Sequence, residues 1–276
     1  MPVSSNRVVA LTGAGSGIGR ALAQALHARG DTLAIADRNE AGLNETRALL
    51  NGPAEVSTHV LDVSSRVAVD GFAHNVLRTH GRIDVAINNA GVGIAGTVAE
   101  LTTDEMAWVM DINFWGVVYG TKAFLPSMLD QRSGTIVNIS SIFGLWGPPN
   151  NSIYAASKFA VRGFSESLRA EVGLAGIHVV TVHPAGVKTA IARRSRIAAA
   201  ADQTRAQKLM ASFDKHLLTI PPEDAAKQII DGIDRKRDRV LIGKDAYRVD
   251  RITRLFGARG SRLLNDSVLK STQQKR

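Results

Sequence analysis

The stretch TGAGSGIG, residues Thr12–Gly19, decides the fold of this chain. It follows a short β-branched run that begins at Arg7, and it leads into IGRALAQALHARG, in which apolar residues recur at helical spacing. Glycines at a strand-to-helix turn let the backbone approach a phosphate, which the N–H groups and the dipole of the helix attract. The residues expected to form this phosphate-binding turn are Gly13, Ser16, Gly17, Ile18 and Gly19.

An acidic residue ends the next apolar run and supports a nucleotide site. Asp37 lies 18 residues after Gly19, near the ~20 expected for the residue that binds the ribose of a dinucleotide. Its carboxylate would accept hydrogen bonds from ribose hydroxyls and repel a 2′-phosphate, so it favours NAD over NADP. Ser16 stands where a basic residue would favour NADP, but Arg38 keeps NADP open because a guanidinium can bind a 2′-phosphate.

Apolar runs recur along the chain and predict seven strands. They lie within Arg7–Gly13, Thr32–Asp37, Ser57–Val63, Ile83–Gly91, Gly134–Ser141, Ile177–Gly186 and Arg239–Gly243. Most are continuously apolar, which is typical of strands buried on both faces. Helical patterns separate them, and three of these end at Gly30, Gly81 and Gly176, which suit helix C-terminal caps. The alternation predicts an α/β fold, a single-domain doubly wound parallel sheet with helices on both faces.

Two segments interrupt this alternation. Residues 187–220 are too long for a simple crossover, and we expect them to form a substrate lid. Residues 244–276 make a basic amphipathic extension to a nucleotide-binding and catalytic domain of residues 1–243. The apolar stripe of the extension comprises Val249, Ile252, Leu255 and Phe256. We expect this stripe to pack on the protein itself or on a second subunit, and contact of residues 244–264 with a membrane surface is the alternative.

Composition narrows the class of protein. Among 276 residues there are no cysteines, which excludes disulfides and thiolate chemistry, and the seven histidines are too scattered to predict a metal site. Residues 235–276 hold 13 basic and 4 acidic residues, which accounts for the whole net charge of +9. We interpret this excess as a solvated surface and expect no nucleic acid partner. No apolar run approaches the ~18 residues of a membrane helix, and no signal peptide is evident, so we expect a cytoplasmic protein.

Several motifs occur in one order along the chain. They are TGAGSGIG, LDV at Leu61–Val63, NNAG at Asn88–Gly91, Asn113 in DINFWG, SS at Ser140–Ser141, YAASK at Tyr154–Lys158, and HPAGVKT at His183–Thr189. With these motifs the sequence resembles the short-chain dehydrogenase/reductase family from about Arg7 to Gly243. The resemblance implies a Rossmann-like sheet in the order 3-2-1-4-5-6-7, a small-molecule substrate, and a homodimer or homotetramer joined through the helices that hold Asn113 and Tyr154.

The resemblance also implies contacts with the rest of the cofactor. These are Asp62 and Val63 at the adenine, Asn89, Ala90 and Gly91 at the adenine ribose, and Pro184, Val187 and Thr189 at the nicotinamide end. Ala185 departs from the glycine that the family often has directly after this proline. We therefore expect the loop to differ locally there.

By the same resemblance the catalytic residues are Asn113, Ser141, Tyr154 and Lys158. Two adjacent serines compete for the serine role. The family separates the serine from the tyrosine by 13 positions, which selects Ser141. Ser140 would point to the opposite side of an extended segment, so we expect it to be structural.

The pair Tyr154 and Lys158 has a chemical rationale, because residues four apart share one face of a helix. A free tyrosine has a pKa near ~10 and is a poor base at neutral pH. The ammonium of Lys158 and the charge of an oxidised nicotinamide would both lower that pKa. Lys158 would also bind the nicotinamide ribose, and Ser141 would donate a hydrogen bond to the substrate oxygen. The resemblance adds water held by Asn113 that links Lys158 to solvent. We expect reversible oxidation of a secondary alcohol to a ketone.

The substrate is less defined by the sequence. Phe143 and Trp146, together with Ser141 and Tyr154, would line an apolar pocket for a lipophilic alcohol; alternatively, the two aromatic residues pack the core or a subunit contact. Three arginines in the lid would instead meet an acidic or CoA-like substrate, namely Arg193, Arg194 and Arg196. Two other functions stay open: an NADPH-dependent ketoacyl-type reductase, and a non-catalytic nucleotide-binding sensor or scaffold.

Overall fold

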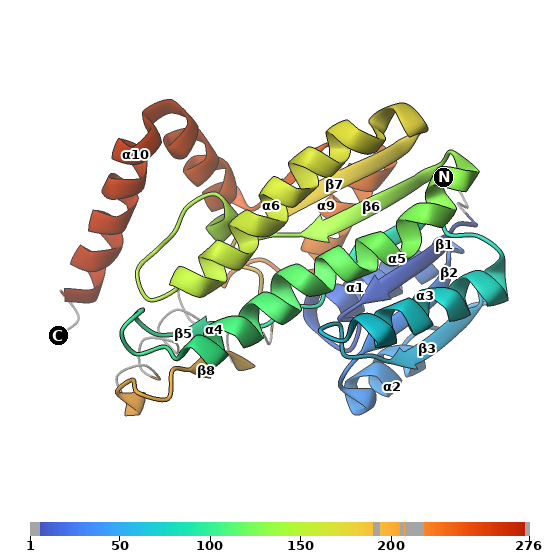
Figure 1. Cartoon of the computed structure of the whole chain (residues 1–276), viewed down its shortest axis with the longest axis horizontal. Coiled ribbons are helices and arrows are strands. Elements are labelled where there is room, and N and C mark those ends of the chain that lie inside the picture. The colour runs from blue at the N-terminus through green and yellow to red at the C-terminus, as the bar shows by residue number, and fades with distance from the viewer. Residues whose placement is uncertain (1–5, 190–193, 205–206, 208–217, 274–276) are drawn as a thin grey trace.

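A computed structural model describes residues 6–189, 194–204, 207 and 218–273. At its centre lies a seven-stranded parallel sheet in the order β3-β2-β1-β4-β6-β7-β9 (Figure 1). The strands are β1 (Val8–Thr12), β2 (Thr32–Asp37), β3 (Val56–Val60), β4 (Val85–Asn88), β6 (Gly134–Ile139), β7 (Ile177–Pro184) and β9 (Arg239–Ile242). Counted along the chain, these are the seven predicted strands in the predicted order 3-2-1-4-5-6-7, so that prediction is confirmed.

Burial along the strands explains their apolar runs. In β1, Val9 and Leu11 enter the core on one face of the sheet, while Val8 and Ala10 enter the core on the other. The edge strands differ: Val60 of β3 is 62% exposed, and alternate residues of β9, at the other edge, are only partly buried. The expected burial on both faces therefore holds for the inner strands and not for the edge strands.

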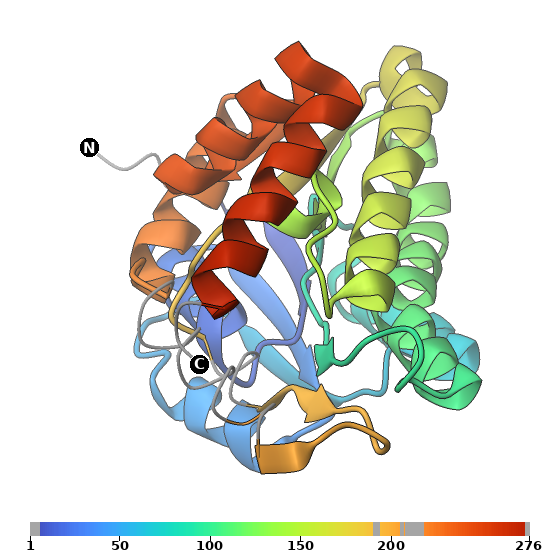
Figure 2. The same ribbon diagram turned by 90° about the vertical axis from the view of Figure 1, so that its left-hand side faces the viewer.

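Helices cover both faces of the sheet (Figures 1 and 2). One face carries α1 (Gly17–His27), α2 (Glu40–Ala48) and α9 (Pro222–Asp234), and the other carries α3 (Arg66–His80), α5 (Gly116–Gln131) and α6 (Ser152–Val172). The predicted caps lie at or just past helix ends. Gly81 caps α3 with φ +68°, and Gly176, with φ +82°, ends the short turn that follows α6. Glycine adopts such left-handed angles without steric cost.

A second, two-stranded sheet was not predicted from the sequence. Its strands are β5 (Ile94–Ala95), after β4, and β8 (Arg196–Ile197), in the excursion after β7. The guanidinium carbon of Arg196 lies 3.8 Å from the ring centroid of Trp108 in α4 (Thr103–Met110). This excursion is the predicted lid; its residues 190–193, 205–206 and 208–217, Arg193 among them, lie outside the described residues.

The chain ends in α10 (Lys244–Gln273), which bends at Gly257 into two arms (Figure 1). Val249 of the first arm is buried with Leu145 and Trp146, and Leu264 and Val268 of the second arm pack against the same cluster. The predicted stripe is therefore divided, because Val249 faces the protein while Leu255 and Phe256 are exposed. None of the helices in the described part of the chain is long and apolar enough to cross a membrane.

Candidate functional site

The glycine turn joins β1 to α1 at the carboxyl edge of the sheet. Gly13 and Gly17 have φ of +68° and +55°, and a Cβ on Gly19 would overlap the carbonyl group of Gly13. The side chain of Ser16, at the N-cap of α1, makes no capping hydrogen bond. The N–H groups of the first turn are thus left to an outside acceptor. This end of α1 is suited to bind an anionic phosphate group.

Asp37 lies beside this turn, at the end of β2. Its Oδ2 atom accepts a hydrogen bond from the backbone N–H of Gly15 at 2.9 Å, and its Oδ1 atom accepts one from the N–H of Asn39 at 2.8 Å. The carboxylate therefore braces the glycine turn. That bracing role was not predicted from the sequence.

Arg38 and Asp62 lie further out, on the surface. The Arg38 guanidinium is 65% exposed and lies 3.9 Å from the Asp62 carboxylate. Burial raises the pKa of Asp62, but hydrogen bonds from Ser64 and the charge of Arg38 outweigh it and leave that pKa below its ordinary value. Asp62 is therefore ionised at neutral pH. Its carboxylate lies within ion-pair distance of the Arg38 guanidinium.

The end of β4 is fastened to the glycine turn. The Asn89 amide donates hydrogen bonds to the carbonyl oxygens of Thr12 and Gly13, at 2.9 and 3.1 Å. The hydroxyl of Thr12 accepts from the N–H groups of Asn89 and Ala90. The Asn89 side chain thus supports the turn, while Val63 is buried nearby in the core.

Tyr154 and Lys158 lie one turn apart on α6, as the sequence predicts. The Lys158 Nζ atom is buried, donates a hydrogen bond to the carbonyl oxygen of Ile139 at 3.0 Å, and lies 5.9 Å from the centre of the Tyr154 ring. The small Ala155 and Ser157 between them are buried. They let α6 pack closely while the tyrosine and lysine reach the end of β6.

The two adjacent serines have different surroundings. The Ser141 hydroxyl hydrogen-bonds the Tyr154 phenol and accepts from the N–H of Phe143 at 3.1 Å, at the start of a turn over Ile142–Gly144. The Ser140 hydroxyl instead donates to the carbonyl oxygen of Lys158 at 2.8 Å. Ser141 thus meets the reactive tyrosine, and Ser140 joins β6 to α6.

Asn113 lies in a π-helical turn, Asp111–Trp115, between α4 and α5. Its amide donates to the carbonyl of Val92 and to the hydroxyl of Ser157, at 3.0 and 3.1 Å, and its oxygen accepts from the N–H of Val92 at 2.8 Å. Such turns occur often at functional sites. A Cβ on Gly91 would lie 3.1 Å from the Asn113 oxygen and 3.4 Å from the Lys158 ammonium. Gly91 therefore lies between these two polar groups.

Burial controls the charges of Tyr154 and Lys158. It raises the pKa of the Tyr154 phenol, and the hydrogen bond from Ser141 only partly offsets the rise. Burial also lowers the pKa of Lys158 to about 8. In the protein alone, therefore, the lysine does not lower the tyrosine pKa as the sequence suggested, and the phenol stays protonated at neutral pH.

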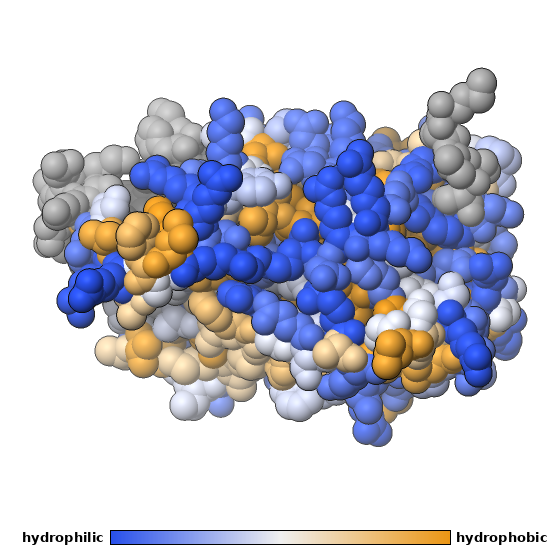
Figure 3. All heavy atoms as spheres, turned by 90° about the horizontal axis from the view of Figure 1, so that it is seen from above, coloured by the Kyte–Doolittle hydropathy of each residue, from blue (hydrophilic) through white to orange (hydrophobic). Residues whose placement is uncertain are grey.

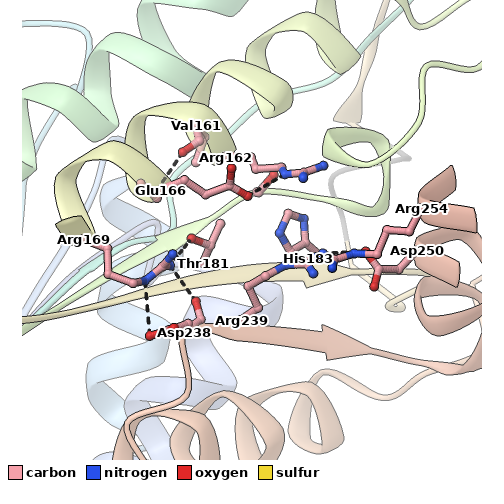
Figure 4. A network of polar contacts seen from close by, with 12 residues as sticks. Val161, Arg162, Glu166, Arg169, Thr181, His183, Asp238, Arg239, Asp250 and Arg254 are labelled. Carbon is pink, nitrogen blue, oxygen red and sulfur yellow. Dashed lines mark hydrogen bonds and ion pairs between the residues drawn. The ribbon is translucent and has the colours of Figure 1, made fainter. Parts of the chain in front are cut away.

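His183, at the end of β7, forms a hydrogen bond with the backbone carbonyl of Ser141. Burial lowers its pKa to about 4, so the ring is neutral. Because a carbonyl oxygen only accepts, Nδ1 carries the hydrogen and donates it to the Ser141 carbonyl at 3.0 Å. Figure 4 shows the ring among charged groups, with Arg239 bound to Asp250 of α10 at 2.6 Å. The sequence analysis quoted His183 only as part of a motif and gave it no role.

The loop expected at the nicotinamide end follows β7. Gly186 has a φ of +60°, whereas the φ of Ala185 is not positive. The left-handed position is thus one residue later, and alanine at 185 causes no backbone strain. Val187 is buried, Pro184 is half-buried, and a Cβ on Gly17 would lie 3.1 Å from the side chain of Thr189. The side chain of Thr189 therefore lies directly against the glycine turn.

The predicted substrate residues separate into two kinds. Phe143 packs edge-on against the Tyr154 ring, with centroids 6.0 Å apart, and so lines the reactive side. Trp146 is only 7% exposed, and its indole N–H donates to Asn265 of α10 at 2.8 Å. Trp146 thus belongs to the packed cluster under α10, the alternative that the sequence left open, and Asn265 was not predicted at all.

Comparisons with known proteins agree with the fold. The family described as short chain dehydrogenase matches residues 7–200. A putative oxidoreductase, SadH, of Mycobacterium tuberculosis is 42% identical over 96% of both chains. A short chain dehydrogenase/reductase from Burkholderia phymatum, solved in complex with NAD, is 33% identical over 92% of this chain and 95% of its own, with a TM-score of 0.83. An alcohol dehydrogenase from the archaeon Thermococcus sibiricus, complexed with 5-hydroxy-NADP, is 25% identical over 86% and 95%, with a TM-score of 0.73.

Proposed function

The chain belongs to the short-chain dehydrogenase/reductase family of oxidoreductases, and on that premise we propose that it interconverts a secondary alcohol and a ketone with a nicotinamide cofactor. The observation that carries the proposal is the meeting of Tyr154, Ser141 and Lys158 at the end of β6. A non-catalytic sensor would not need a buried lysine beside the Tyr154 phenol, since burying an ammonium is costly.

The described residues fit a dinucleotide. The uncapped start of α1 suits the phosphates, and the close approach of Gly19 to Gly13 leaves no side chain over that turn. Asp37 stands where it would meet the adenosine ribose, with Asp62, Val63 and Asn89–Gly91 beside the adenine half, while Lys158 and Thr189 would hold the nicotinamide half. A bound nicotinamide supplies the hydride acceptor or donor for this reaction.

Asp37 supports NAD over NADP. Its carboxylate would repel a 2′-phosphate, and the Arg38 guanidinium lies 3.9 Å from the Asp62 carboxylate. Solved relatives are bound to NAD in one case and to an NADP derivative in another, so kinship alone leaves the choice open. Fluorescence titration with NADH and NADPH tests it, and we expect tighter binding of NADH. Tighter binding of NADPH would favour the ketoacyl-type reductase.

Different side chains transfer the proton, bind the substrate oxygen and connect the site to solvent. In alcohol oxidation the hydroxyl proton passes to the Tyr154 oxygen, and in ketone reduction the phenol returns it. The raised pKa of Tyr154 keeps that proton in place at neutral pH, which suits the reducing direction. Ser141 accepts from Phe143 and bonds the Tyr154 phenol, and its hydrogen would turn to the substrate oxygen when a substrate binds. Lys158 and Asn113 stand where a water-mediated proton path to solvent would begin.

An apolar substrate fits the ring of Phe143 beside Tyr154. The alternative of an acidic or CoA-like substrate has less support, because Arg196 stacks on Trp108 and belongs to β8. A homodimer or homotetramer joined through α5 and α6 also remains part of the proposal. Trp115 and Phe159, which are 43% and 41% exposed on these helices and the π turn, support it.

The decisive test is Tyr154→Phe, assayed on a panel of secondary alcohols and ketones with both nicotinamides. We expect turnover to fall by about 10²–10⁴-fold, with NADH binding retained. Tyr247→Phe, the same change at a tyrosine that is 46% exposed on α10, serves as the matched control and should keep most of the turnover. Near-wild-type turnover in Tyr154→Phe would refute the role of the phenol, and NADH binding by the wild-type protein without turnover of any panel member would favour the sensor.

A further inference from the structure

The bend in α10 forms a fixed corner. Gly257 has φ +51° and ψ −130°, which breaks the helix into an arm over residues 244–256 and an arm over residues 258–273. Gly260 is buried where the arms meet, and a Cβ there would lie 2.6 Å from the carbonyl oxygen of Ile252. The two arms are therefore in close backbone contact directly beside the bend.

The inner face of this helical corner is held by the rest of the protein. Asp250 of the first arm binds Arg239 of β9 at 2.6 Å and Arg254 at 3.1 Å (Figure 4). The second arm is held by the bond from Trp146 to Asn265 and by the packing of Leu264. Because the inner face is fixed, the outer face has one defined orientation.

Three large apolar side chains stand on that outer face. Leu255, Phe256 and Leu263 are 76%, 57% and 63% exposed, and all lie within two turns of Gly257. Single exposed apolar residues are ordinary, but a cluster of them marks a contact surface. Figure 3 shows an apolar group at the left of the molecule, on the side where Figure 1 draws α10, with hydrophilic residues around it.

Arginines surround these apolar residues. Arg248, Arg251, Arg259 and Arg262 are exposed, and none of them forms an ion pair within the part of the chain that the structure describes. The second arm has a single acidic residue, Asp266. A second copy of the chain would meet this face with the same four arginines across a two-fold axis, and like charges opposed there would repel.

We propose that the corner of α10 docks on an anionic lipid bilayer. Leu255, Phe256 and Leu263 would enter the boundary between headgroups and acyl chains, as the apolar side of an interfacial helix does. The arginine stems can lie along the apolar boundary while their guanidinium groups bind lipid phosphates. The protein would thus lie on the surface of the membrane.

Co-sedimentation of the full-length protein with vesicles tests this docking. We expect at least about fivefold more binding to phosphatidylcholine vesicles that contain phosphatidylglycerol than to pure phosphatidylcholine, with loss at high salt. Leu255→Ser combined with Phe256→Ser should lower binding by about tenfold or more, and Arg259→Gln combined with Arg262→Gln by several-fold. Leu174→Ser and Arg66→Gln, changes of the same kind at exposed positions elsewhere, should leave binding unchanged.

Two results would overturn the proposal. One is equal sedimentation of the wild-type chain and the corner variants, with thermal melting showing that both are folded. The other is that the apolar variants dissociate an oligomer in sedimentation velocity while the wild-type chain ignores both vesicle types, which would make a second copy the occupant of this face.

Discussion

The cofactor side and the substrate side of the site are built in different ways. On the cofactor side, the glycine turn is braced by Asp37 and Asn89, which lie at the ends of β2 and β4. On the substrate side, the wall around Trp146 is completed by Asn265, 119 residues further along the chain. The cofactor side is held by side chains that bond backbone groups at neighbouring strand ends. The substrate side depends on how the distant helix α10 bends and packs.

This difference has a physical consequence. A turn that needs positive φ and close backbone approach allows only glycine at defined positions, so a single added methyl group is costly there. A packed wall of leucine, valine and tryptophan tolerates substitutions of similar volume. Changes on the cofactor side should therefore have larger effects than changes on the substrate side, and substitutions at three positions test that order.

The largest effect is expected for Gly19→Ala. The new Cβ would overlap the carbonyl group of Gly13, which is backbone and cannot move aside. We expect a loss of about 1–3 kcal/mol in the free energy of unfolding and cofactor binding weakened by about 100-fold, measured by urea denaturation and NADH fluorescence. Gly71→Ala in α3 is the control, because its Cβ meets open space and a helix interior gains about 0.5–1 kcal/mol from alanine. Equal behaviour of the two variants would contradict the comparison.

The sequence predicted that the glycine turn and Asp37 lie together because that constraint is local. The glycine spacing and the acid at the end of β2 follow from strand and turn geometry over short distances, whereas the choice of Ser141 came from the spacing that the family resemblance implies. The strands β5 and β8 have two residues each and carry no detectable pattern. Nor could the sequence reveal that Asn265 meets Trp146, because that contact depends on the bend at Gly257 and on the packing of Leu264 and Val268. The raised pKa of Tyr154 was missed because burial, which depends on the whole fold, outweighs the hydrogen bond from Ser141.

An intermediate effect is expected at His183, which lies between the two sides. Its pKa falls from 6.5 to about 4 on folding, so between these pH values the unfolded chain binds a proton that the folded chain does not. Stability should therefore fall as the pH drops from 6.5 to 4, by about 3 kcal/mol from this group. His183→Asn should remove that part of the pH dependence in urea titrations. We also expect His183→Leu to lower kcat by about tenfold, since the Ser141 carbonyl loses its donor; unchanged NADH binding would separate this from an effect on the cofactor side.

The smallest effect is expected for Asn265→Leu on the substrate side. The leucine side chain still fills the space beside Leu264, but the indole N–H of Trp146 loses its acceptor. The second arm of α10 should therefore shift relative to the cluster that includes Trp146 and Phe143. We expect KM for an apolar ketone to rise by about threefold, equivalent to roughly 0.7 kcal/mol, with kcat and NADH binding little changed. Asn265→Asp retains an acceptor oxygen and should restore KM, and tryptophan fluorescence should report the lost bond in the leucine variant only. A rise in the KM for NADH as large as that for the ketone would mean that the two sides are coupled through α10, and the division between them would then be wrong.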